Sequence, residues 1–133
     1  MDLTAQAHAS MPLTETLGIE VVVASQEEVH LRLEYQDRLC TAGGILHGGA
    51  LMALADSAGA YCAFLHLPDG ATGTATIESK TNFFRAVRDG HVDATARPLH
   101  SGRTTIVVET DLRDAAGKHV ARVTQTQAVL MPS

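Results

Sequence analysis

The sequence predicts an α+β fold in which one curved antiparallel β-sheet wraps around a single long central helix. Residues 43–64, GGILHGGALMALADSAGAYCAF, are apolar on nearly every side of a helix, so other elements must surround them. Most of the remaining chain alternates apolar and polar residues with the period of a strand. Tight turns join these segments, which favours antiparallel pairing.

A short helix and two strands are expected before the long helix. In residues 29–35, VHLRLEY, apolar and polar side chains alternate as in a strand with one buried face. The preceding residues 20–25, EVVVAS, are rich in β-branched valine and are expected to form its hairpin partner.

Four strands are expected after the long helix. Residues 67–73, LPDGATG, carry the Pro and Gly residues of a loop. The residues DAAGK at 114–118 are typical of a hairpin turn. The predicted strands around these turns are residues 74–84, 91–99, 103–113 and 119–130.

Size and charge limit what the protein can be. A chain of 133 residues, 45% of them hydrophobic, can bury one compact core, so residues 1–133 are expected to form a single domain. The formal net charge is -5, and the ten Lys and Arg residues are scattered along the chain. This distribution argues against nucleic acid as the partner, and any bound anion must be met by local groups.

Several features favour a cytoplasmic location. The first 18 residues show no basic segment followed by an apolar run. Cys40 and Cys62 form no CxxC motif and lie beside apolar residues, as is typical of reduced thiols. Residues 43–64 carry His47 and Asp56 and lack flanking basic clusters, which indicates a core helix and no membrane span.

The residues His47-Gly48-Gly49 stand where the long helix is expected to begin. Glycines there would let a ligand approach the first free backbone N–H groups, whose partial positive charge suits an oxyanion. The glycines could equally relieve crowding between helix and sheet. His47 is either a hydrogen-bonded structural residue or a base.

Asp56 is a carboxylate within an apolar helix. Such a group is almost always paired, hydrogen-bonded or used in chemistry. It could hold a backbone N–H or a hydroxyl of a partner chain. Its other interpretation is a general base or nucleophile in a mostly dry cleft.

The stretch 43–64 resembles the signature of the hot-dog-fold acyl-CoA thioesterases of the PaaI-like branch, which belongs to phenylacetate degradation. The shared features are a glycine, then His-Gly-Gly, then the acid nine residues after the His. Three further segments also resemble that branch: TETLGIEVV, TNFFRAVRDGHVDATARPLHSGRTT and DAAGKHVARVTQTQAV. The resemblance implies a hydrolase of aryl- or arylacetyl-CoA thioesters that needs no cofactor, since coenzyme A is part of the substrate.

The resemblance also implies roles for residues at the acid and at the helix start. Asp56 would be the catalytic carboxylate, the backbone N–H of Gly48 would polarise the thioester carbonyl, His47 would shape the turn, and Gly49 would contact the substrate. Many relatives carry Asn or Gln six residues before the His, where this chain has Thr41. A hydroxyl supplies one donor where an amide supplies two.

A hydroxyl beside the acid is a further implication of the resemblance. Relatives with Asp as the acid often carry Ser or Thr on the strand after the helix, which assigns Thr76, or Ser79 in a shifted register. Thr76 could equally be an ordinary strand threonine. The related branch that uses Glu tends to carry Thr one turn after the acid, where this chain has Ala60.

Coenzyme A brings phosphates, which need local cations in an acidic protein. The resemblance places Arg85, Arg88, Arg103 and Thr104 near the nucleotide, although each arginine alone is typical of a solvated surface. No metal site is expected, because no His or Cys pair has helical or CxxC ligand spacing.

Helical arithmetic predicts a shared site. Gly48 and Asp56 are eight residues apart, hence about 12 Å along one helix, whereas both groups must lie about 3 Å from the reacting carbonyl. If both act, Asp56 and the N–H donor come from different subunits, so a homodimer with antiparallel helices is expected. The resemblance extends this to a tetramer built as a dimer of dimers.

Two other functions are compatible with parts of the sequence pattern. A hydratase or dehydratase of the same fold pairs its Asp with a His five residues later, where this chain has Tyr61. A non-catalytic acyl-CoA-binding protein would share the fold and stays open as an alternative.

Overall fold

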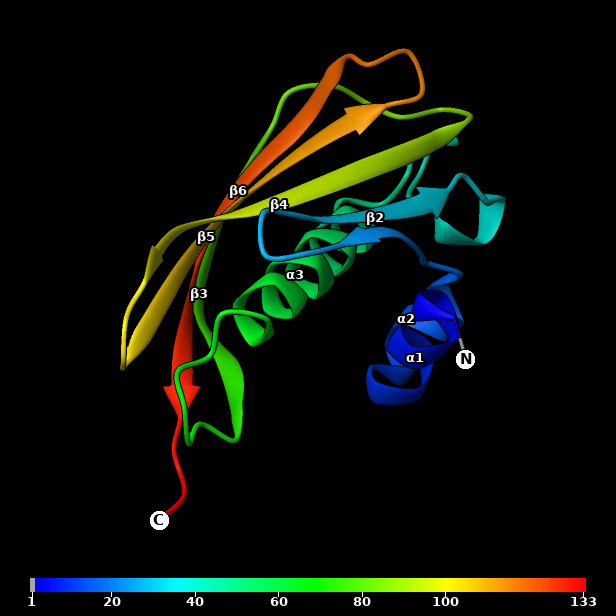
Figure 1. The fold of residues 1–133 in the computed structure, drawn as a ribbon. Coiled ribbons are helices and arrows are strands. Elements are labelled where there is room, and N and C mark those ends of the chain that lie inside the picture. The colour runs from blue at the N-terminus through cyan, green and yellow to red at the C-terminus, as the bar shows by residue number, and fades with distance from the viewer. Residues whose placement is uncertain (1) are drawn as a thin grey trace.

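The computed structural model describes residues 2–133 and contains one six-stranded antiparallel sheet that curves around one long helix, α3 (Gly48–Phe64). Figure 1 shows α3 lying against the concave face of the sheet. The strands lie in the order β1-β2-β4-β5-β6-β3. The predicted α+β fold class is confirmed.

The strands follow the predicted ones closely. β1 (Glu20–Ala24) and β2 (Val29–Glu34) pair as a hairpin, as expected. The elements after α3 are β3 (Gly73–Phe83), β4 (His91–Ser101), β5 (Thr105–Asp114) and β6 (His119–Leu130). Their limits lie within two residues of the predicted ones because the period-two pattern and the turn residues are local signals.

The helical segments differ from the prediction in two places. The expected short N-terminal helix is two helices, α1 (Leu3–Ser10) and α2 (Pro12–Leu17), because Pro12 lacks a backbone N–H and begins a new first turn. The long helix begins at Gly48, five residues later than the apolar stretch. Gly43 and Gly44 have φ of 80° and 73°, a left-handed conformation that places them in a turn. A short 3-10 turn, η1 (Asp37–Leu39), precedes that loop.

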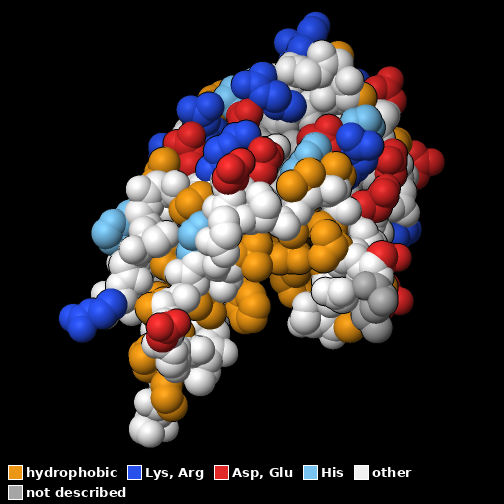
Figure 2. All heavy atoms as spheres, in the orientation of Figure 1, with side chains coloured by type: hydrophobic (Ala, Val, Ile, Leu, Met, Phe, Trp, Pro, Cys, Tyr) orange, Lys and Arg blue, Asp and Glu red, His pale blue; other side chains and the backbone are white. Residues whose placement is uncertain are grey.

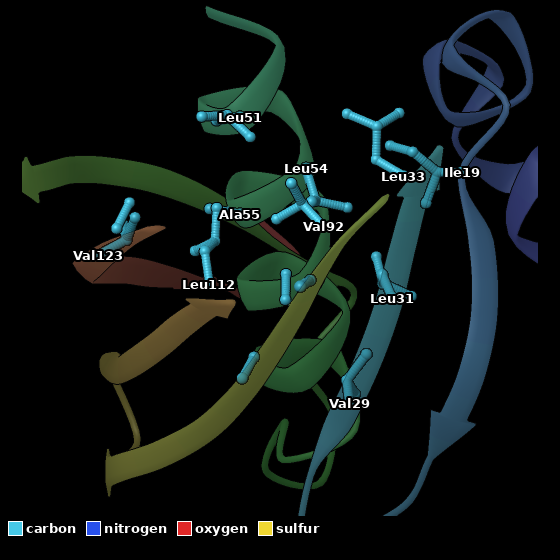
Figure 3. Close-up of a cluster of buried hydrophobic side chains, with 14 of the residues drawn as sticks. Ile19, Val29, Leu31, Leu33, Leu51, Leu54, Ala55, Val92, Leu112 and Val123 are labelled. Carbon is cyan, nitrogen blue, oxygen red and sulfur yellow. The ribbon is translucent and has the colours of Figure 1, made fainter. Parts of the chain in front are cut away.

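The core lies between α3 and the inward-facing side of the sheet. Alternate residues of β2, β4 and β5 are buried and face the helix. Figure 3 shows side chains of α3 packed among those of the strands. Prominent members are Leu51, Leu54 and Ala55 on the helix and Leu31, Leu33, Val92, Leu112 and Val123 on the sheet.

The helix is not surrounded within one chain, in contrast to the expectation from its all-round apolar character. The sheet and the N-terminal helices cover part of α3, and Met52 and Phe64 remain 40% and 57% exposed. Within the described residues 2–133, the edge strand β3 pairs with β6 alone, and its Ile77 is 62% exposed. One curved sheet can cover only one side of a helix, so α3 and the β3 edge share an uncovered region.

Both cysteines are free. Within residues 2–133, no helix is sufficiently long and apolar to cross a membrane.

His47 caps the start of α3. Its Nδ1 accepts a hydrogen bond from the backbone N–H of Gly49 at 2.7 Å, which satisfies one of the unpaired donors of the first helical turn. A β-carbon at position 49 would lie 2.8 Å from Nδ1, so the ring can reach back only over a glycine. At position 48 a β-carbon would lie 3.3 Å from the ring of Phe83. Close packing against Phe83 and His47 therefore explains why glycine stands at positions 48 and 49.

We expect the substitution His47→Ala to lower the free energy of unfolding by about 1 kcal/mol, the usual loss when a helix cap is removed. His47→Asn should keep most of the stability, because an asparagine side chain is also a good cap. Urea unfolding followed by circular dichroism measures both values. Equal stability of the Ala and Asn variants would show that the cap contributes nothing.

Candidate active site

Asp56 lies at the middle of α3 and is half-buried, on the side of the helix that faces β3 and β6. The hydroxyl of Thr76 on β3 donates a hydrogen bond to its Oδ1 at 2.7 Å. The amide Nε2 of Gln125 on β6 donates to the same oxygen at 3.2 Å. Of the two hydroxyl residues that the sequence offered on β3, Thr76 and not Ser79 makes this contact.

A second buried amide lies behind Thr76. Nε2 of Gln127 donates to Oγ1 of Thr76 at 2.6 Å. The hydroxyl of Thr74 lies within hydrogen-bond distance of two acceptors, Oε1 of Gln127 at 3.0 Å and the carbonyl of Ala128 at 2.9 Å. Gln125 and Gln127 are both fully buried. A carboxylate that would be costly inside an apolar environment thus receives neutral donors from two strands.

Sequence reasoning missed both glutamines. They stand two residues apart in β6, and the buried positions of that strand are residues 120, 121, 123, 125 and 127. Two amides at inward positions of a predicted strand were a readable signal, because buried polar side chains need partners.

The helix start offers one free donor of the expected pair. The Gly49 N–H is occupied by His47, so it is removed from the donors expected to contact a ligand. Within residues 2–133, the Gly48 N–H has no hydrogen-bond acceptor. The structure does not bring Gly48 and Asp56 together in one chain, since they lie eight residues apart on the same helix, or about 12 Å.

Thr41 lies at the Gly48 end of the helix and is exposed. It belongs to the loop before α3, where its backbone N–H donates to the carbonyl of Ile45 at 2.8 Å. Within one chain Thr41 is therefore associated with the N–H donor and not with the carboxylate.

The residues expected near coenzyme A divide into two groups. Arg88 donates to the carbonyl of Gly43 in the loop before α3 at 3.3 Å. The N–H of Arg85 donates to the carbonyl of Val120 at one end of β6. These two arginines are both exposed and flank the same end of the sheet.

Arg103 and Thr104 lie at the other end of β6. The N–H of Val129 donates to the carbonyl of Thr104 at 2.9 Å. Because Val120 and Val129 are nine residues apart on one strand, the two groups are separated by about 30 Å. Within a single chain, β6 therefore holds Arg103 and Thr104 apart from Arg85 and Arg88.

A groove of about 560 Å³ lies between α1, the last turns of α3 and the start of β3. Figure 2 shows apolar side chains gathered around this hollow beneath the sheet. Its lining includes Ala60, one helical turn beyond Asp56, together with Tyr61, Phe64 and Met11. An apolar group of a ligand could therefore lie close to the carboxylate.

The Cys62 thiol is not available as a nucleophile for this site. Cys62 is buried, and burial raises the pKa of its thiol to about 11, so it stays protonated near neutral pH. Among residues 2–133, no cluster of His, Cys, Asp or Glu side chains is arranged to hold a metal ion.

Comparison with known proteins identifies the family. The model of the thioesterase superfamily matches residues 43–121. ComA2 from Bacillus subtilis is 36% identical over 121 residues, which cover 89% of this chain and 94% of that protein. The crystal structure of thioesterase HI1161 from Haemophilus influenzae superposes with a TM-score of 0.89 at 26% identity, covering 98% of this chain and 92% of that chain.

The PaaI protein of the Escherichia coli phenylacetic acid degradation operon shares the fold, with a TM-score of 0.86 at 22% identity over 98% of this chain and 93% of that chain. The matched family region contains the helix start, the carboxylate and Thr76. The chain belongs to the thioesterase superfamily and is a thioester hydrolase with the hot-dog fold.

Proposed function

We propose that the protein hydrolyses acyl-CoA thioesters, with aryl or arylacetyl groups as the preferred acyl part. The observation that carries this proposal is the half-buried Asp56 carboxylate, which is held by two neutral donors where α3 meets the edge strand β3. It lies one helical turn from an apolar groove. A thioester carbonyl beside this carboxylate would meet a base in a site with little water.

The proposed site is formed by two chains. Asp56 supplies the acid, and the Gly48 N–H of a second chain supplies the oxyanion donor. A two-fold axis beside α3 would set the two helices antiparallel and bring these groups together. The exposed Met52 and Ile77 and the unpaired β3 edge are the surface that a second chain would cover. Two such dimers would make the tetramer.

The acyl group and the coenzyme A phosphates of the substrate are assigned to different parts of the surface. The groove beside Tyr61 and Phe64 offers aromatic and aliphatic contacts, and its volume of about 560 Å³ lies in the range of small-molecule sites. Arg85 and Arg88 lie near the start of α3, and we assign them to the phosphates of coenzyme A. Arg103 and Thr104 would reach a nucleotide only from another chain.

The proposed chemistry uses the charge that develops on the carbonyl oxygen. The Gly48 N–H, together with the partial positive charge of the helix N-terminus, would stabilise this oxyanion. Asp56 would either take a proton from an attacking water or attack the carbonyl itself to form an anhydride that water then cleaves. Thr41 would supply a single hydroxyl donor beside the Gly48 N–H.

We expect Asp56→Asn to lower kcat by at least about a hundredfold, because it removes the base while keeping the shape of the side chain. Release of coenzyme A from phenylacetyl-CoA, followed with a thiol reagent, measures this rate. Circular dichroism and gel filtration check that the variant stays folded and keeps the wild-type assembly. Turnover close to wild type would remove Asp56 from the mechanism.

Substrate preference tests the groove. We expect Phe64→Ala to raise KM for phenylacetyl-CoA about tenfold and to leave hydrolysis of acetyl-CoA unchanged, because only the larger acyl group reaches that side chain. Phe64 is 57% exposed, so its truncation should leave the fold intact. Equal effects on both substrates would place the acyl group elsewhere.

Mixed dimers test the shared site. A dimer of one Asp56→Asn chain and one Gly48→Pro chain contains one site with both groups intact and one with neither. It should therefore recover about half of the wild-type rate, while each homodimer is nearly inactive. Proline suits the first helical position but has no N–H. Two affinity tags isolate the mixed species, and an inactive, folded mixed dimer would contradict the two-chain site.

A further inference from the structure

We propose that Gln125 and Gln127 are positioning residues that determine which oxygen of Asp56 reacts. The two buried amides hold Oδ1, directly or through Thr76, and leave Oδ2 for the attacking water or the thioester carbon. This inference rests on the proposed role of Asp56 and extends it to single atoms.

The direction of each proton follows from the donors available. An amide nitrogen can only donate, so Oγ1 of Thr76 accepts from Nε2 of Gln127 at 2.6 Å. The single proton of the Thr76 hydroxyl is then free to point at Oδ1 of Asp56, 2.7 Å away. Oε1 of Gln127 lies 3.0 Å from the Thr74 hydroxyl, whose single proton is shared between this oxygen and the carbonyl of Ala128 at 2.9 Å. Gln127 therefore makes Thr76 a donor toward the carboxylate.

Gln125 acts on the same carboxylate oxygen. Its Nε2 lies 3.2 Å from Oδ1, so Oδ1 receives two hydrogen bonds. Among residues 2–133, no side chain or backbone group donates to Oδ2. Rotation of the carboxylate would break both charge-assisted bonds. The arrangement thus holds one oxygen and leaves the other available to a reactant.

Gly59, which has no side chain, leaves the space that the Gln125 amide occupies. Gly59 is buried in α3, three residues after Asp56, where alanine would favour the helix more than glycine does. A β-carbon at position 59 would lie 2.1 Å from Oε1 of Gln125. Only a glycine allows this amide to lie beneath the helix and reach Asp56.

The Gln125 amide is also costly to the fold. Its Oε1 is buried without a hydrogen-bond partner among residues 2–133, and a buried acceptor without a partner is unfavourable. An apolar side chain of the same size would avoid that cost. A feature that opposes stability at two positions, Gly59 and Gln125, points to a role in the site.

The test compares Gln125→Met and Gln127→Met, which keep the volume of the side chain and remove the donor. We expect each to lower kcat for phenylacetyl-CoA by about 10- to 100-fold with KM changed less than about twofold, because the carboxylate loses its fixed orientation. The matched control is Thr110→Val on β5. Thr110 is fully buried and its hydroxyl also lacks a partner within residues 2–133, but it is outside this network. The control should keep wild-type kcat.

A second pair of variants separates positioning from stability. Gly59→Ala should displace Gln125, lowering both kcat and the midpoint of thermal unfolding. In the double variant Gly59→Ala with Gln125→Ala, the new methyl group fills part of the vacated space. Its unfolding midpoint should rise above that of Gly59→Ala, while kcat stays low. Recovery of kcat together with stability would show that Gln125 has only a structural role.

Asp56→Asn in the same assay distinguishes failure of the proposed function from failure of this inference about Gln125 and Gln127. Wild-type activity of Asp56→Asn would contradict the proposed function itself. An inactive Asp56→Asn enzyme, combined with wild-type kcat in the folded Gln125→Met and Gln127→Met variants, would overturn only this inference. If the inference holds, adding Gln125→Met to Asp56→Asn lowers the residual rate no further.

Discussion

The hydrogen bonds that tie Asp56 to β3 and β6 are the interaction on which the rest of the site depends. A carboxylate in an apolar helix must find donors, and the nearest strands supply them through Thr76 and Gln125. These donors come from residues 20 and 69 positions away in the chain. Pairing between β3 and β6 places them side by side, so the site exists only when the sheet is formed.

The same sheet leaves the opposite side of the site open. It covers one face of α3, and β3 stays unpaired along its outer edge. Exposed Met52, Phe64 and Ile77 lie on the helix and strand that carry Asp56 and Thr76. Uncovered apolar surface next to a polar network suits a site that a second chain completes.

Three glycines of α3 each allow a different close contact. Gly48 makes room for Phe83, Gly49 for the ring of His47, and Gly59 for the amide of Gln125. None of the three has a left-handed backbone, so conformational freedom does not explain them. They lower the intrinsic preference for the helix, and the packing of α3 against the sheet offsets that loss.

The sequence by itself determined the features that depend on neighbouring residues. Alternation located the strands, Pro and Gly marked the turns, and the charge of Asp56 in an apolar helix singled it out. The resemblance to the hot-dog thioesterases also assigned Thr76. Tertiary structure decided what depends on pairing between distant segments. The partners Gln125 and Gln127 lie on the last strand, the Gly49 N–H is taken by His47, and β6 separates Arg85 from Arg103. Sequence patterns report the face of an element to which a side chain belongs, whereas its contacts depend on strand order and register, which only the folded sheet sets.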